Sequence, residues 1–351
     1  MNQFSILKQM FESLSEQEKN NFIEYLKGEP QKDSKPFCDF KQLILSHNHG
    51  DSERPCCPHC KSVHVVKNGH VKGGQRYMCK DCKRTFAITN NTILFSSKKP
   101  LGTWEKYLEC MMNKFSLRKC AEVCEIGLST AFIWRHKILD ALQNMHNEVI
   151  INGIAQADET YFSVSYKGNH KKANFKMPRK AHKRGSSDKK PGISQEKACV
   201  LCSVNLDGLS IGKISNLGRP CVYDLETVFN QRIEKGAILV TDSFKGYAKL
   251  AFKNGLTHIA VPRGKHTNGA FNIQTINSYH SELKRLIQQN FKGVATKYLN
   301  NYVVYHNFVN FAKGSFSEKL NILKEHTFTT CIKFKSKEIQ IREAIPVLRV
   351  A

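Results

Sequence analysis

Three polar residues on separate segments have types and positions suited to binding a divalent metal. Asp158 ends the apolar run Gly-Ile-Ala-Gln-Ala-Asp (153–158), and Asp242 ends the run Ala-Ile-Leu-Val-Thr-Asp (237–242). Asn277 lies in a predicted helix, 35 positions after Asp242. Carboxylate and amide oxygens are ligands that Mg²⁺ accepts, and a pair of ions held in this way promotes cleavage or joining of phosphodiester bonds. We therefore expect these three residues to converge on one metal site.

The predicted helix also carries a lysine on the same face as Asn277. Lys284 follows seven positions later, which is two helical turns, so a cation is expected beside the metal ligand. Glu282 lies five positions from Asn277 and points about 140° away from it. Glu159 faces away from Asp158 if the strand continues through both. Neither glutamate is therefore expected to bind the metal.

The elements that must position these residues alternate between strands and helices. The strands are predicted at Gly153–Ala157, Ala198–Asn205, Leu209–Ser215, Ala237–Thr241 and Leu256–Val261, with a crossover helix at Val222–Ile233. The order is three strands, helix, strand, helix, strand, helix. It predicts an RNase H-like fold, a mixed five-stranded sheet flanked by helices, in which central strands are apolar throughout. An acidic residue at the end of such a strand is unusual in an apolar core, but it is expected if the residue binds a metal.

Two Cys-x-x-Cys pairs precede this region and have the spacing of a zinc ribbon. Cys57 and Cys60 form the first pair, Cys79 and Cys82 the second, with 18 residues between the pairs. Together they offer four thiolates to one structural zinc, whose binding free energy would supply much of the folding energy of so small a unit. Cys56 and His59 are competing ligands, but each breaks the two-plus-two symmetry of the pairs. A redox dithiol is the other interpretation, against which the paired spacing argues.

Residues between the ribbon and the predicted sheet have a helical pattern. Helices are predicted at Leu101–Phe115, Leu117–Glu125 and Ser129–Met145, and the last two have helix-turn-helix spacing. On the third helix, Trp134, Arg135 and Lys137 are the candidates for DNA contact. A plain three-helix spacer would give the same pattern and is the alternative.

The chain is basic, with a formal net charge of +24 over 351 residues, and the excess is uneven. Residues 1–54 are net negative, whereas the insert 163–197 holds 11 Lys or Arg and 2 acidic residues. A phosphate backbone is the partner that such a surface indicates. The insert is either a solvated loop or an arm that folds on DNA. No long apolar run or signal peptide occurs, so we expect a cytoplasmic protein with no membrane span.

Several motifs in this order resemble the insertion-sequence DDE-type transposases that carry an N-terminal zinc ribbon, relatives of the Merlin elements. The motifs are Cys57–Cys60, Arg76–Cys82, Ala157–Phe162, Lys183–Gly185, Thr241–Tyr247, Thr275–Lys284 and Lys297–Leu299. The resemblance covers roughly residues 50–315, and this chain is similar to the members that have Asn as third ligand followed by Lys seven positions later. It implies Asp158, Asp242 and Asn277 as the catalytic triad, with Lys284 alongside.

The resemblance further implies an enzyme that cleaves DNA and transfers strands with two Mg²⁺ or Mn²⁺ ions, after binding the terminal inverted repeats of its element. It implies double-stranded DNA as partner and a homodimer or higher oligomer on it. The residues predicted to contact DNA are Arg76, Lys83, Arg84, Trp134, Arg135, Lys137, Lys183, Arg184 and Lys245. A catalytically inactive DNA-binding regulator and a nuclease without strand transfer are the alternatives.

The predicted organisation has five parts. They are an N-terminal helical segment and linker (1–50), a zinc ribbon (51–97), a helix-turn-helix segment (98–150), an RNase H-like catalytic domain (151–315) and a C-terminal tail (316–351).

Overall fold

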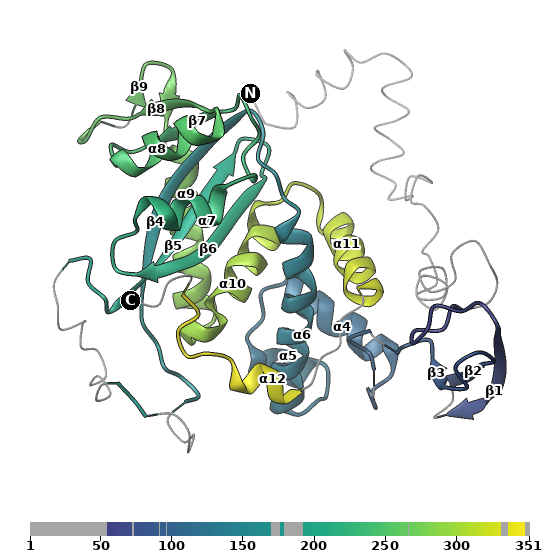
Figure 1. Ribbon diagram of the computed structural model, residues 1–351. Coiled ribbons are helices and arrows are strands. Elements are labelled where there is room, and N and C mark those ends of the chain that lie inside the picture. Colours follow the sequence, from purple (N-terminus) through teal and green to yellow (C-terminus); the bar gives the residue numbers. More distant parts are fainter. Residues whose placement is uncertain are drawn as a thin grey trace, which may run out of the picture.

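Most of the chain after residue 54 is described by the computed structural model. The described residues are 55–71, 74–90, 92–95, 97–169, 176–178, 192–265, 267–330 and 336–347. The predicted N-terminal helical segment therefore lies outside them, as does most of the basic insert, including Lys183 and Arg184. Figure 1 shows a small three-stranded unit, a group of helices and a larger sheet following one another along the chain.

The small unit is an antiparallel sheet with the strand order β1-β2-β3. Its strands are β1 (Val65–Val71), β2 (Gly74–Cys79) and β3 (Thr85–Ala87). Its buried core holds only Cys57, Val65, Cys79 and Phe86. A core of four side chains is too small to stabilise a sheet by itself, which agrees with the predicted need for a metal.

Three helices follow, close to the predicted bounds. They are α4 (Leu101–Met112), α5 (Leu117–Val123) and α6 (Leu128–Asn147). The side chain of Ser116 caps α5 by accepting a hydrogen bond from the backbone N–H of Lys119. The indole rings of Trp104 in α4 and Trp134 in α6 stack with centroids 3.6 Å apart, which joins the first helix to the third.

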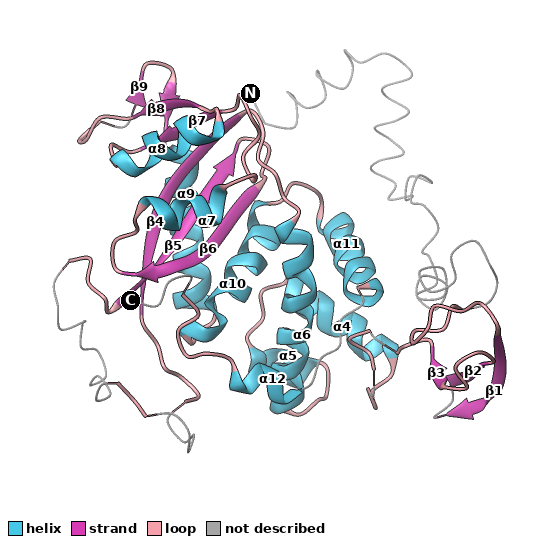
Figure 2. Ribbon diagram, in the orientation of Figure 1, coloured by secondary structure: helices cyan, strands magenta, loops and turns pink. Residues whose placement is uncertain are grey.

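The larger sheet has the predicted five strands and mixed pairing, so the RNase H-like fold class is confirmed (Figure 2). Its strands are β4 (Ile154–Ser163), β5 (Lys197–Asn205), β6 (Ser210–Leu217), β7 (Ile238–Thr241) and β8 (Thr257–Ala260). The order is β6-β5-β4-β7-β8. Strands β6, β5 and β4 are antiparallel, whereas β4, β7 and β8 run parallel.

One strand is longer than predicted. The strand expected to end at Ala157 continues to Ser163, because β5 pairs with it along its whole length, from Ala155 to Ser163. Its parallel neighbour β7 ends at Thr241, opposite Ala157. Asp158 therefore lies inside a strand, at the point where the neighbouring strand stops.

Helices cover both faces of this sheet. One face packs against α7 (Val222–Phe229) and α8 (Lys245–Asn254). The other packs against α9 (Gln274–Arg285), which continues as the π-helical turn η1 (Leu286–Asn290), and against α10 (Leu299–His306). The remaining elements of this region are the short pair β9 (Thr267–Asn268) and β10 (Phe271–Asn272) and the turns η2 (Thr296–Tyr298) and η3 (Asn307–Phe311).

The alternation of side chains along β5 shows how the two cores divide. Ala198, Val200 and Cys202 belong to the core under α9 and α10, whereas Cys199 and Leu201 belong to the core under α7 and α8. Both cysteines of this Cys-x-x-Cys spacing are fully buried. Residues of even number on β5 thus face the helix that carries Asn277.

The segment predicted as a tail contains two helices that pack on the earlier ones. Helix α11 (Phe316–Thr329) lies against α4 and α6, and α12 (Ser336–Ile341) lies against α6. Phe328 is fully buried and meets Trp104 edge to face, with ring centroids 6.5 Å apart. One continuous core therefore contains α4, α5, α6, one face of the large sheet and the C-terminal helices.

This packing corrects the prediction for the third helix of the helix-turn-helix pattern. Trp134 and Arg135 are buried, and the Arg135 guanidinium donates a hydrogen bond to the carbonyl of Phe115. The Lys137 ammonium donates to the carbonyl of Ile93. Because helices pack around α6 on several sides, Trp134 and Arg135 stabilise the core and do not lie on a surface open to DNA, whereas Lys137 is half-buried.

Candidate active site

Asp158 and Asp242 lie on adjacent parallel strands at equivalent positions. The register pairs Ala157 with Thr241, so each aspartate is the next residue after a paired one. Neighbouring strands lie about 4.8 Å apart, which places the two carboxylates side by side on one edge of the site. The Asp242 side chain accepts a hydrogen bond of 2.9 Å from the backbone N–H of Phe244, which fixes its orientation at the start of α8.

Helix α9 crosses the sheet face over β4, and a buried glutamine holds its first turn. The backbone N–H of Ile276 donates to Oε1 of Gln156, two residues before Asp158 on the same face of the strand, at 3.0 Å. The first N–H groups of a helix have no partner within the helix, so Gln156 supplies one. Asn277 follows Ile276 directly, and its position against β4 is set by this contact.

One stripe of α9 carries Asn277, His280 and Lys284, because residues three and four apart share a helix face. His280 makes the direct link to the strand, with its Nδ1 atom 3.7 Å from Oδ2 of Asp158. Asn277 and Lys284 are exposed on either side of it. The structure thus brings Asp158, Asp242 and Lys284 into one region, with Asn277 one turn from the histidine that contacts Asp158.

The surroundings of Asp158 disfavour the ionised form of its carboxyl group. Its pKa is raised to about 7, chiefly by burial and then by the negative charges of Glu159 and Asp242, whereas Lys284 lowers it. Desolvation and like charges both disfavour the ionised form, and a bound cation would favour it. Such a shifted carboxyl at a carboxylate pair is typical of a functional site.

The two glutamates rejected as ligands point elsewhere in the structure. Glu159 lies on the opposite face of β4 and accepts a hydrogen bond of 3.3 Å from the hydroxyl of Tyr247 in α8. Glu282 approaches His306 of α10, with 3.9 Å between its Oε2 atom and Nε2 of the ring. The predicted orientations of both residues therefore agree with the structure.

His280 was not singled out by the sequence reasoning. Its ring is nearly buried, and burial, followed by the charge of Lys284, lowers its pKa to about 3, so the ring is neutral at physiological pH. A histidine three positions after Asn277 lies on the face that meets Asp158. The helical periodicity that places Asn277 and Lys284 on one face at seven positions also places His280 there at i, i+3, and this was the signal that could have found it.

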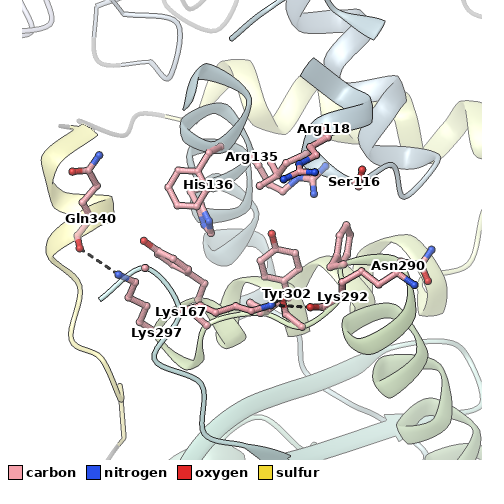
Figure 3. A pocket seen from close by; sticks show the side chains of 18 residues that line it. Ser116, Arg118, Arg135, His136, Lys167, Asn290, Lys292, Lys297, Tyr302 and Gln340 are labelled. Carbon is pink, nitrogen blue, oxygen red and sulfur yellow. Dashed lines mark hydrogen bonds between the residues drawn. The ribbon is translucent and has the colours of Figure 1, made fainter. Parts of the chain in front are cut away.

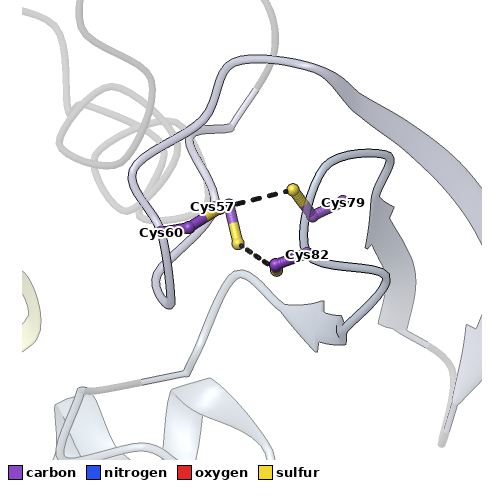
Figure 4. Close-up of side chains that lie close together, drawn as sticks. All are labelled: Cys57, Cys60, Cys79 and Cys82. Atoms are coloured by element: carbon purple, nitrogen blue, oxygen red, sulfur yellow. Dashed lines mark hydrogen bonds between the residues drawn. The ribbon is translucent and has the colours of Figure 1, made fainter.

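The four predicted zinc ligands converge tightly in the small sheet (Figure 4). Their sulfur atoms all lie within 4.8 Å of one another, with 3.6 Å between Cys57 and Cys82 and 3.6 Å between Cys60 and Cys79. A tetrahedral zinc with bonds of about 2.3 Å holds its sulfurs about 3.8 Å apart. The pKa of the Cys79 thiol is lowered to about 6, chiefly by the backbone N–H of Cys82. The cluster therefore fits one metal ion.

The other cations predicted to contact DNA lie on surfaces of the ribbon and the catalytic domain. Lys83 and Arg84 are exposed beside the second cysteine pair, and Lys245 is exposed at the first residue of α8. Arg76 is half-buried and donates to the hydroxyl of Thr85 across the ribbon. These positions are compatible with a DNA surface, unlike those of Trp134 and Arg135.

No helix among the described residues has both the length and the apolarity that a bilayer crossing requires. No curated protein is similar to this chain at a significant level. Among solved structures, the chain is similar to one in the crystal structure of a pre-cleavage Mos1 transpososome, at 9% identity and a TM-score of 0.23, with 68% of this chain and 82% of that chain covered. Residues 150–308 match the family described as the ISXO2-like transposase domain. These residues span the large sheet, both aspartates, Asn277 and Lys284, so this part of the chain matches an ISXO2-like transposase domain.

Proposed function

We propose that Asp158, Asp242 and Asn277 hold the catalytic divalent metal ions of this transposase. The observation that supports this most is the register of β4 and β7, which sets two carboxylates side by side beneath the stripe of α9 that carries Asn277. Two Mg²⁺ or Mn²⁺ ions bound there would activate the attacking oxygen and stabilise the leaving oxygen of a phosphodiester. The ligands provide two negative charges, because the amide of Asn277 adds none.

The surrounding residues have complementary tasks in this proposal. Lys284 lies two turns along α9 from Asn277 and binds the phosphate backbone beside the reacting group. Lys245, at the N-terminal end of α8, binds a second phosphate close to Asp242, where the helix dipole also favours an anion. The neutral ring of His280 packs against Asp158 and limits the orientations of its carboxylate. His280 is a positioning residue and not a ligand.

Recognition of the element ends is assigned to the ribbon. The four cysteines hold a structural zinc, and the exposed Lys83 and Arg84 contact the backbone of the terminal inverted repeats. Helix α6 is part of the helical core and is not assigned to the major groove. Because two ends of an element must be cut and joined, the active form on DNA is a dimer or a larger assembly.

A cleavage and strand-transfer assay with supplied element ends, a target plasmid and Mg²⁺ tests the proposal. We expect the Asp158→Asn and Asp242→Asn variants to bind the ends and to lose at least about a thousandfold in cleavage rate. The matched control is Asp207→Asn, which alters an exposed aspartate at the far end of the β5–β6 hairpin, where it pairs with Lys313.

The alternatives give different results in the same assay. A regulator would bind the ends with no metal-dependent cleavage by the unaltered chain, and a nuclease would cut without joining. Equal cleavage by the unaltered chain and by Asp158→Asn would remove these aspartates from the mechanism, whatever the chain does to DNA.

A further inference from the structure

A cavity of about 750 Å³ lies between the helical segment and the loop that follows α9, away from the two aspartates. Figure 3 shows Arg118, Arg135 and His136 on one side of it, and Lys167, Lys297 and Tyr302 on the other. A second cavity of about 390 Å³ shares Leu117, Arg118, Phe132 and Gln340 with the first and extends to the exposed start of α6. The chamber thus has an opening on the surface formed by α5 and α6.

The wall of the cavity is strongly positive. Arg118, Arg135, Lys167, Lys292 and Lys297 line it, and none of the described residues that line it is acidic. The pKa of His136 is lowered to about 3 by burial and then by the charges of Arg342, Arg135 and Lys297. A cavity with several cations and no carboxylate favours an anionic occupant.

The same wall is rich in aromatic rings. The ring of Tyr298 lies 4.2 Å from His136 and 5.6 Å from Phe132, measured between centroids. On the opposite side, the rings of Phe291 and Tyr302 meet edge to face at 5.0 Å. Phe132 and Phe291 are partly buried, whereas His136, Tyr298 and Tyr302 are buried behind them. Aromatic rings that border a basic wall can hold a nucleobase by stacking while cations hold its phosphate.

A buried polar side chain at the wall indicates that the cavity is a binding site and not a packing defect. Arg135 is fully buried, and its Nε and Nη1 atoms have no hydrogen-bond partner among the described residues. Its guanidinium lies 5.1 Å from the centre of the Phe291 ring, directly behind the aromatic wall. Its Nη2 atom donates to the Phe115 carbonyl, but none of the described residues gives it a carboxylate partner, and a buried cation without a counter-ion is costly. An anion in the adjoining cavity would offset that cost.

The rim of the cavity is held in one conformation. Lys167 donates hydrogen bonds to the carbonyls of Lys292 at 2.8 Å and Gly293 at 3.1 Å, which ties the end of β4 to the loop after η1. Gly293 has a φ of +84°, and a Cβ atom there would lie 3.2 Å from the Lys167 ammonium. Only glycine suits this position, so the rim is fixed by the sequence.

The cavity and the catalytic stripe lie on one continuous helical element. Asn290, which lines the cavity, follows Asn277 by 13 residues through α9 and η1. At about 1.5 Å per residue this is roughly 20 Å. A DNA duplex rises about 3.4 Å per nucleotide along its axis, so it covers that distance in about six nucleotides.

We propose that this cavity binds a single nucleotide turned out of the DNA duplex, with its base between the aromatic rings and its phosphate near Arg118 and Lys292. The proposal rests on the proposed function only in taking DNA as the partner. The ligand is a nucleoside phosphate, which could come either from a DNA strand or from a free nucleotide. We commit to the extrahelical nucleotide, because the opening lies beside the helical segment and within a few nucleotides of the cleavage site.

The test compares two duplexes that differ in one nucleotide. The full chain is titrated, without added divalent metal, into a 30-base-pair duplex with one bulged 2-aminopurine nucleotide and into the same duplex without the bulge. We expect about tenfold tighter binding of the bulged duplex, the size of one base stacked on an aromatic ring, with quenching of the 2-aminopurine fluorescence. Arg118→Ala and Lys292→Ala should reduce this preference to about twofold or less.

A matched control lies on the same helix. Lys119→Ala, next to Arg118, removes an exposed cation that pairs with Glu122, and should weaken binding of both duplexes equally while keeping the preference. Phe132→Leu should reduce the quenching without changing the charge. Equal affinity for the two duplexes, or a preference that survives the Arg118→Ala, Lys292→Ala double variant, would overturn the proposal.

The source of the ligand is decided in a separate arm. Binding of dAMP or ATP that is lost in Arg118→Ala, with no preference for the bulged duplex, would mean that the cavity takes a free nucleotide and would also overturn the proposal. None of these measurements requires cleavage. The result of these binding measurements is therefore independent of the result of the cleavage assay, and a failure of one proposal can be told from a failure of the other.

Discussion

The molecule has two candidate metal sites, and they are assembled in different ways. The four cysteines of the ribbon lie within residues 57–82, and their sulfurs already meet within 4.8 Å around a core of four side chains. Asp158, Asp242 and Asn277 come from two strands and a helix, and the sheet register and the Gln156 contact hold them in place. At the first site a bound metal would hold the small sheet together, whereas the residues of the second are positioned by the large sheet and its helices.

The largest expected effect of this difference is seen on removal of zinc. A strong chelator, or Cys60→Ala, should unfold the ribbon, because structural zinc contributes on the order of 10 kcal/mol to units of this kind. The only two tryptophans, Trp104 and Trp134, stack in the helical core and report on the rest of the molecule. We expect zinc release and proteolysis of the ribbon with unchanged tryptophan fluorescence. Loss of both signals together would show that the two regions fold as one.

At the carboxylate site, removal of a candidate ligand should stabilise the folded chain, whereas at the ribbon it should unfold the unit. The reason is that the buried carboxylate of Asp158 destabilises the fold when it is ionised. The pKa of Asp158 is raised to about 7 in the folded chain, above the unfolded value, so stability falls as pH rises from about 4 to 7 and stays low above it. Asp158→Asn should therefore raise the free energy of unfolding by about 2–4 kcal/mol at pH 8 and by less at pH 5. Urea titrations followed by tryptophan fluorescence measure this.

Added Mg²⁺ gives the matching control for that experiment. It should stabilise the unaltered chain at pH 8 much more than Asp158→Asn, since the variant keeps only the Asp242 carboxylate to attract the ion. A destabilised Asp158→Asn chain at pH 8 would contradict the raised pKa.

The sequence predicted the elements that carry the second candidate site better than the packing around them. Apolar runs were sufficient for β4 and β7, and helical spacing for the shared face of Asn277 and Lys284 on α9, because each signal is local to one element. The metal-binding role of these residues stays a prediction. The burial of Trp134 and Arg135 depends on α10, α11 and α12, which pack across α6 from more than 150 residues away. An amphipathic pattern does not show how many other helices pack against a given helix. The extension of β4 past Asp158 likewise depends on pairing with β5, which the run of residues 153–157 does not encode.

A smaller effect concerns the helical core that supports the second site. The pKa of His146 is lowered to about 3, chiefly by burial, so its contribution to stability is present above about pH 6.5 and is lost as pH falls toward 3. Between pH 7.5 and 5, the unaltered chain should lose about 2 kcal/mol more stability than His146→Gln. Paired urea titrations at the two pH values isolate this difference. Equal losses would show that His146 titrates normally.

The smallest expected effect is at the third ligand of the carboxylate site. Asn277→Ala should raise the Mg²⁺ concentration for half-maximal cleavage about tenfold, and Asn277→Asp should lower it again, because the added carboxylate attracts the ion. Ser278→Ala, the exposed neighbour on α9, is the control and should leave the Mg²⁺ dependence unchanged. A Mg²⁺ dependence that is the same in all three variants would remove Asn277 from the ligand set.

The shared core of the helical segment and the large sheet has a consequence for engineering. Asn301 of α10 and Arg342, just after α12, both bind the carboxylate of Asp140 on α6, so helices from three parts of the chain depend on one aspartate. A chimaera that takes its end-recognition module from another transposase should therefore be joined just before α4, near residue 100. A junction inside α4–α6 would leave the recipient half with an exposed apolar face and no soluble product.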